Sequence, residues 1–107
     1  MSTQPLPAYR PPVATLECEG RPFPLFPGEN HIGRSRDCGI VLSDTTVSRR
    51  HAVITIDGDA IWIHDLDSKN GTYVEGERIS RRQVTCSEII GFGAVIARMA
   101  DPESSAS

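Results

Sequence analysis

Short runs of alternating apolar and polar residues, separated by turn residues, repeat along the chain between positions 13 and 100. No window of ten or more residues places its apolar positions at the three- and four-residue spacing of a helix. Alternation with a period of two is typical of β-strands that bury one face. The pattern therefore predicts about ten short strands in a β-sandwich or a barrel.

A tight hairpin is predicted in the middle of the chain. The segments HAVITI (51–56) and AIWIHDL (60–66) are rich in β-branched residues and flank the sequence DGD. Asp-Gly adopts the backbone angles of a two-residue hairpin turn. The other predicted strands are 13–18, 23–26, 30–33, 40–42, 88–92 and 94–100, with two more inside 72–79 that are divided at Glu75-Gly76.

The two ends of the chain differ from this pattern. Residues 1–12 are rich in proline and residues 101–107 are small and polar, so both are predicted to be flexible tails around one domain at 13–100. No apolar run approaches the roughly 20 residues that cross a bilayer, and the N-terminus lacks the pattern of a secretory signal. We therefore expect a cytoplasmic protein without a membrane partner.

Charge and cysteine content narrow the possible functions. The net charge of −3 argues against a general nucleic-acid binder. Ten of the eleven basic residues are arginines, whose planar guanidinium suits carboxylates and phosphates. Three widely spaced cysteines fit neither a disulfide framework nor a zinc site, so we expect reduced thiols, no metal and no cofactor.

Three predicted loops contain nearly all the unusual polar chemistry. They are residues 33–39, 43–51 and 67–72. Loops at one end of a sandwich are held in place by the sheets and commonly bind ligands. If these three loops meet, they form a single site.

A hydrolase that uses Ser48 and His51 is one interpretation of the second loop. It requires a base that contacts the serine hydroxyl, a group that orients the base, and an oxyanion hole. Residues three apart need not face each other where SRRHAVITI enters a strand, and no nucleophile-elbow glycines surround Ser48. A loop histidine that bonds to the backbone is the interpretation we favour for His51.

Phosphate binding accounts for more of these residues. A phosphate dianion needs fixed N–H and O–H donors together with guanidinium groups. Arg34, the hydroxyl and N–H of Ser48, and Arg49 supply such a set. The amide of Asn70 can pair with the main chain of an extended peptide, because it offers both a donor and an acceptor.

These residues resemble the signature of the forkhead-associated (FHA) family. The segments HIGRSRDCGIVLSDTTVSRRHAVI and IHDLDSKNGTYVEGERI contain its glycine-arginine, its serine and histidine three residues apart, and its asparagine-glycine. The corresponding residues are Gly33-Arg34, Ser48 with His51, and Asn70-Gly71. The resemblance spans about residues 13–100.

The resemblance implies an eleven-stranded β-sandwich of two twisted, mostly antiparallel sheets that binds phosphothreonine peptides through its loops. Arg34 and Ser48 would contact the phosphate, and Arg49 would contact the phosphate or the peptide backbone. Asn70 would bond to the peptide main chain. Gly33, His51 and Gly71 would be structural, with Gly71 allowing the turn after Asn70.

Three positions depart from the family pattern. Lys69 stands where many members have threonine, so we include it in the site as a second cation. Glu75 replaces the usual turn asparagine, and Thr46 offers a hydroxyl where some members have a basic residue. These departures affect the expected peptide selectivity and leave phosphate binding in place.

The predicted function is a non-enzymatic, phosphothreonine-dependent interaction module that acts downstream of a Ser/Thr kinase. A phosphorylated threonine in the chain's own tails, for which Thr3 and Thr15 are candidates, is a second source of the ligand. The alternative is a domain with the same scaffold that binds partners independently of phosphorylation.

The remaining polar and aromatic residues have simpler interpretations. Trp62 is expected to pack within its strand, and Asp65 to end that strand and shape the next loop. Solvated surface charge is expected for Arg36, Arg50, Arg81 and Arg82.

Overall fold

The computed structural model describes residues 12–100, which form eleven strands. Within this range no helix is long and apolar enough to span a bilayer. The strands are β1 (Ala14–Cys18), β2 (Arg21–Leu25), β3 (Gly28–Gly33), β4 (Ile40–Val41), β5 (Ala52–Asp57), β6 (Ala60–Asp65), β7 (Thr72–Val74), β8 (Glu77–Ile79), β9 (Arg81–Val84), β10 (Ile89–Phe92) and β11 (Val95–Ala100).

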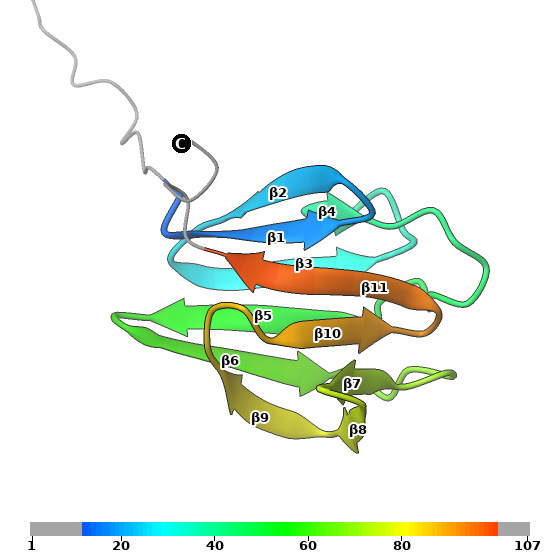
Figure 1. Ribbon diagram of the computed structural model, residues 1–107. Helices are drawn as coiled ribbons and strands as arrows, with labels where there is room; N and C mark the ends of the chain where they lie inside the picture. The colour runs from blue at the N-terminus through cyan, green and yellow to red at the C-terminus, as the bar shows by residue number, and fades with distance from the viewer. Residues whose placement is uncertain (1–11, 101–107) are drawn as a thin grey trace, which may run out of the picture.

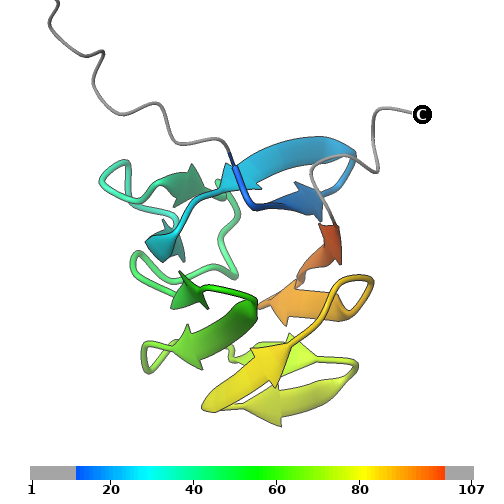
Figure 2. The same cartoon turned by 90° about the vertical axis from the view of Figure 1, so that its left-hand side faces the viewer.

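The strands form two sheets that pack face to face (Figures 1 and 2). The six-stranded sheet has the order β2-β1-β11-β10-β7-β8, and the five-stranded sheet has the order β4-β3-β5-β6-β9. Every pairing is antiparallel except that of β3 with β4. The predicted sandwich of eleven strands is therefore confirmed.

The core lies between the sheets and follows the alternation in the sequence. In β1 and β11 every second residue is buried, and the residues between them face outward. Leu16, Ile54, Ile63, Ile90 and Phe92 are fully buried at the centre. Burial of each such side chain stabilises the fold by about 1.5–3 kcal/mol relative to leaving it exposed.

Strand β9 was not predicted, because its sequence RRQV shows no apolar alternation and only Val84 is buried. It pairs with β6 at the edge of the five-stranded sheet.

Two arginines of β9 were expected to be solvated surface charges. Arg81 is exposed, and its guanidinium lies 4.2 Å from the ring centre of Trp62. The expectation of a solvated charge is wrong for Arg82, which is half-buried and donates to Glu88 at 3.1 Å.

The turn between β7 and β8 explains one departure from the family pattern. Glu75 and Gly76 have φ angles of 51° and 84°, and a left-handed conformation is unfavourable for glutamate. The carboxylate of Glu75 accepts the N–H of Ile89 at 2.6 Å, and its own N–H donates to the carbonyl of Ile89 at 2.8 Å. These bonds attach the hairpin to β10 and offset the cost of the conformation.

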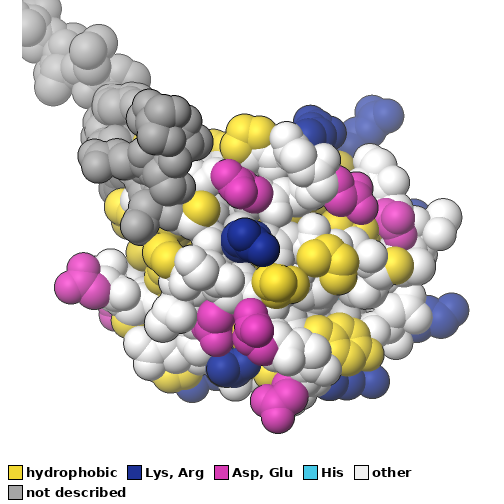
Figure 3. All heavy atoms as spheres, in the orientation of Figure 1, with side chains coloured by type: hydrophobic (Ala, Val, Ile, Leu, Met, Phe, Trp, Pro, Cys, Tyr) yellow, Lys and Arg dark blue, Asp and Glu magenta, His cyan; other side chains and the backbone are white. Residues whose placement is uncertain are grey.

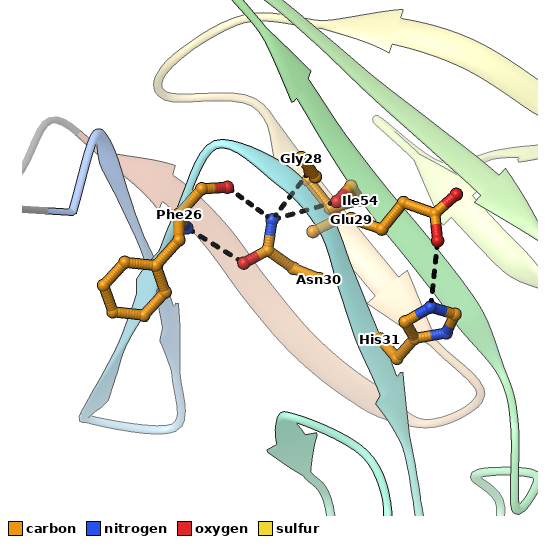
Figure 4. A network of polar contacts seen from close by, with 6 residues as sticks. All are labelled: Phe26, Gly28, Glu29, Asn30, His31 and Ile54. Atoms are coloured by element: carbon orange, nitrogen blue, oxygen red, sulfur yellow. Dashed lines mark hydrogen bonds and ion pairs between the residues drawn. The ribbon is translucent and has the colours of Figure 1, made fainter. Parts of the chain in front are cut away.

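A buried asparagine fixes the turn that leads into β3 (Figure 4). The amide oxygen of Asn30 accepts the N–H of Phe26 at 2.9 Å, and its NH₂ group donates to the carbonyls of Phe26 and Ile54. A buried amide is tolerated when its donors and acceptors are satisfied. Asn30 thereby joins β3 to β5 and sets the direction in which β3 runs toward the loops.

Two further sequence expectations concern the ends and the thiols. The predicted tails, 1–12 and 101–107, lie outside the described residues except for Pro12. Thr15 does not belong to a tail, because it lies in β1 opposite Pro24 and Ala100. The three cysteines form no disulfide within the described residues, and burial raises the pKa of the Cys18 thiol to about 11.

Candidate functional site

The three loops chosen from the sequence meet at one end of the sandwich, on the right in Figure 1. The N–H of Arg34 donates to the carbonyl of Ser48 at 3.0 Å, which joins the first loop to the second. The third loop is joined to the second by two bonds. The N–H of Lys69 donates to the hydroxyl of Ser48 at 3.0 Å, and the amide of Asn70 donates to the carbonyl of Thr46 at 2.8 Å.

Gly33 lies at the point of closest approach between the first two loops. A β-carbon at this position would lie 2.0 Å from the carbonyl oxygen of Arg49. Glycine is therefore required for β3 to end so close to the second loop. This contact places Arg34, the next residue, at the edge of the site.

Arg34 is exposed and is oriented through one nitrogen of its guanidinium. Its Nε–H donates to the carbonyl of Val47 at 3.0 Å. Within residues 12–100 the two terminal nitrogens of the guanidinium have no hydrogen-bond or ion-pair partner. They are available to an anion, and the bond from Nε limits the movement of the side chain.

Ser48 has different roles for its backbone and its side chain. Its N–H donates to Nδ1 of His51 at 3.0 Å, so the expectation that this N–H binds the phosphate does not hold. Its hydroxyl oxygen accepts the N–H of Lys69. The hydroxyl proton has no acceptor in the described part of the chain and remains free to be donated to a ligand.

His51 is fully buried beneath the loops. Because Nδ1 accepts the N–H of Ser48, the proton lies on Nε2, which donates to the carbonyl of Gly71 at 2.9 Å. The ring of Phe92 packs edge-on against the imidazole at 5.8 Å between ring centres. His51 thus connects the second loop to the third.

This geometry opposes the hydrolase interpretation. A catalytic base must contact the hydroxyl of the nucleophile. Both ring nitrogens of His51 are instead occupied by main-chain groups, namely the N–H of Ser48 and the carbonyl of Gly71. In this arrangement His51 cannot accept the hydroxyl proton of Ser48.

The third loop is organised by Asp65 at the end of β6. Its carboxylate accepts the hydroxyl and the N–H of Ser68 and the hydroxyl of Thr72. The hydroxyl oxygen of Ser68 in turn accepts the N–H of Gly71 at 3.0 Å. Burial acts to raise the pKa of Asp65, but these hydrogen bonds outweigh it and the pKa lies below its ordinary value.

Asn70 projects from this ordered loop and is exposed. One amide N–H is occupied by the carbonyl of Thr46. The amide oxygen and the second N–H have no partner within residues 12–100. They present an acceptor beside a donor, which is the pairing offered by the edge of a strand.

Thr46 is a residue whose role the sequence analysis missed. Its hydroxyl donates to Asp44 and accepts the N–H of Ala94 at 2.8 Å, so it does not offer a free hydroxyl to a ligand. These bonds join the second loop to the turn between β10 and β11. Aspartate two residues before threonine is a common local hydrogen-bonding pattern, and it could have indicated this role.

The loop end of the molecule is basic although the whole chain has a net charge of −3. Lys and Arg side chains project from the right-hand end of the molecule in Figure 3. The two ion pairs that the described residues contain, His31–Glu29 and Arg82–Glu88, do not involve the loop cations. Those exposed cations are Arg34, Arg36, Arg49, Arg50 and Lys69.

The residues that the structure describes do not include a metal-binding cluster of three or more His, Cys, Asp or Glu side chains. The exposed polar groups of the loops include hydrogen-bond donors and guanidinium groups. Unpaired cations next to a free hydroxyl suit the binding of an oxyanion. The fold and the loops together define an all-β sandwich with unpaired cations and a serine hydroxyl gathered at one end.

Comparison with known proteins gives the family. A model of the FHA domain matches residues 30–93, which is more than half of the chain. The FHA domain-containing protein FhaA of Mycobacterium tuberculosis is 40% identical over 82 residues, covering 75% of this chain. The chain belongs to the FHA family.

Solved structures agree with this assignment. A structure from a study of phosphothreonine-dependent FHA domain interactions matches with a TM-score of 0.80 and 35% identity, over 82% of this chain and 95% of that chain. Mycobacterium tuberculosis EmbR in complex with a low-affinity phosphopeptide matches with a TM-score of 0.79 and 36% identity, over 84% of this chain. The chain spans only 16% of FhaA and 24% of the EmbR chain.

Proposed function

We propose that this chain binds phosphothreonine peptides of partner proteins and acts as a non-enzymatic interaction module in kinase signalling. The observation that carries the proposal is the meeting of Arg34, the hydroxyl of Ser48 and the amide of Asn70 at one end of the sandwich. Two similar structures support it: one comes from a study of phosphothreonine-dependent FHA domain interactions, and the other is a complex with a phosphopeptide.

The proposed roles follow from which atoms are free. The terminal nitrogens of Arg34 and the hydroxyl proton of Ser48 bind the phosphate. Arg49 is exposed next to Ser48 and adds a contact to the phosphate or to the peptide backbone. Lys69 contributes a second cation, and Asn70 pairs with the peptide main chain. Each charge-assisted hydrogen bond contributes about 1.5–3 kcal/mol.

Several residues of the proposed site are structural. Gly33 permits the approach of the first loop to the second, and His51 connects the second loop to the third. Gly71 has a φ of 91°, which its turn requires. We propose a domain extending over residues 13–100, in agreement with the strands at its two ends.

The source and location of the ligand are part of the proposal. A Ser/Thr kinase phosphorylates a threonine of the partner protein, and a phosphorylated Thr3 of this chain would compete for the same site. We propose a cytoplasmic location, supported by three cysteines that form no disulfide within residues 12–100, because reduced thiols persist in reducing compartments. Neither nucleic acid nor membrane is a proposed partner.

The test is a titration of matched peptides that carry threonine, phosphoserine or phosphothreonine. The Arg34→Ala variant should lose tenfold or more in affinity for the phosphothreonine peptide, since it removes at least about 1.4 kcal/mol. Arg36→Ala is the matched control, because Arg36 is exposed in the same loop, and it should bind within about twofold of wild type. Equal binding of phosphorylated and unmodified peptides would instead support phosphorylation-independent recognition.

A further inference from the structure

The turn formed by Asn70 and Gly71 is flanked by two side chains that the proposed function does not use. Gly71 has a φ of 91°, and a β-carbon at this position would lie 2.9 Å from Nε of Arg78 and 3.1 Å from the hydroxyl oxygen of Tyr73. The guanidinium and the phenol therefore lie directly against the bare α-carbon of Gly71. They lie next to the residue that is proposed to bind the peptide main chain.

The register of the hairpin places these two side chains together. Tyr73 in β7 lies opposite Arg78 in β8. The neighbours of Tyr73 in the strand, Thr72 and Val74, are fully buried and face the core. Tyr73 and its partner therefore face outward on the six-stranded sheet, at the end near the loops. Both side chains reach over Gly71, so the guanidinium and the phenol lie close to the same turn.

Arg78 differs from the two arginines that follow it in sequence. Arg81 stacks on Trp62, and Arg82 is paired with Glu88. Arg78 is exposed and has no hydrogen bond or ion pair to any residue between 12 and 100. Within the described residues it is an unpaired cation that lies against Gly71.

We propose that Arg78 forms a second anion subsite, which selects an acidic side chain in the bound phosphothreonine peptide. This inference rests on the proposed function, because it requires a peptide main chain paired with Asn70. A guanidinium group binds a carboxylate through two parallel hydrogen bonds. The selected residue is an aspartate or glutamate close to the peptide residue that pairs with Asn70. The preferred ligand then carries two anionic groups, the phosphate and the carboxylate.

A scan of peptides tests the subsite. The peptides carry one phosphothreonine in an alanine background, with an aspartate placed in turn at each of the three positions on either side. Dissociation constants are measured for wild type, Arg78→Ala and Arg98→Ala by fluorescence anisotropy. Arg98 is the matched control because it is exposed on β11 of the same sheet.

In wild type, aspartate at one position should improve affinity about two- to fivefold, the range of a solvent-exposed ion pair. Arg78→Ala should lose this gain and bind the all-alanine peptide within twofold of wild type, whereas Arg98→Ala should keep the gain. Arg78→Glu should prefer lysine over aspartate at the same position. Circular dichroism and the thermal midpoint establish that each variant is folded.

Three results would overturn the subsite. They are the absence of a favoured position for aspartate in wild type, a gain that persists in Arg78→Ala, and an equal loss by that variant for every peptide. Failure of the proposed function has a different signature. In that case the alanine-background peptide would bind wild type equally with and without its phosphate.

Discussion

The N–H of Ser48 points at Nδ1 of His51, and the imidazole is thereby turned away from the serine hydroxyl. A pair that suggests catalysis in the sequence is a structural contact in the fold. The histidine uses its second nitrogen to hold Gly71. The serine hydroxyl remains free to donate to a ligand because the histidine does not accept from it.

Replacing His51 with alanine should destabilise the domain by about 3 kcal/mol or more. The change leaves a cavity in a fully buried position and removes the partners of the Ser48 N–H and the Gly71 carbonyl. Urea denaturation measures the loss. His64→Ala is the control, because His64 is exposed in β6, and a similar loss in both variants would contradict the role of His51.

Gly33→Ala should weaken phosphopeptide binding and destabilise the domain by about 1–3 kcal/mol, because the new β-carbon cannot lie 2.0 Å from the carbonyl oxygen of Arg49. The matched control is Gly39→Ala. A β-carbon at position 39 has the carbonyl oxygen of His31 as its nearest neighbour, at 3.9 Å. Thermal melts and peptide titrations on both variants test this prediction. Unchanged peptide binding by Gly33→Ala would contradict the role of Gly33 in placing the first loop.

Thr46→Val should destabilise the domain by about 1 kcal/mol and weaken peptide binding. Valine keeps the shape of threonine but lacks the hydroxyl that joins Asp44 to Ala94. Thr46→Ser should restore both properties, since it retains the hydroxyl. Thr45→Val changes an exposed neighbour and should have little effect. Hydrogen exchange at the amide of Ala94 reports the bond directly, and equal exchange in wild type and Thr46→Val would refute it.

Asp65→Asn should destabilise the domain, and the difference from wild type should depend on pH. Because hydrogen bonds lower the pKa of Asp65 in the folded state, its carboxylate stabilises the fold fully above the pKa of an unfolded aspartate, about 3.9. This contribution is lost as pH falls through the lower pKa of the folded state. Urea denaturation at pH 7 and at pH values below 4 should show the difference shrinking.

The control for this measurement is Asp59→Asn. Asp59 is exposed in the turn between β5 and β6, at the end of the sandwich opposite the three loops (Figure 1). At pH 7 and below pH 4 alike, the free energy of unfolding of this variant should stay close to that of wild type. A pH-independent difference between wild type and Asp65→Asn would show that the carboxylate does not act through its charge.

Alternation in the sequence predicted most strands because the core requires every second side chain to be apolar. It located β5 and β6 around their turn and divided β7 from β8 at Glu75-Gly76. It missed β9, whose stability comes from pairing with β6 and from the packing of Arg81 on Trp62. An edge strand that buries one residue leaves no periodic signal.

The kinds of polar atoms in the loops could be predicted from the sequence, because residue types such as arginine, serine and asparagine fix their donors and acceptors. Which of those atoms are already occupied depends on the fold. The hydroxyl of Thr46 and the N–H of Ser48 are satisfied inside the protein, while the terminal nitrogens of Arg34 remain unpaired within the described residues. The physical reason is that hydrogen bonds between loops depend on distances that strand packing sets. Spacing along the chain does not contain those distances.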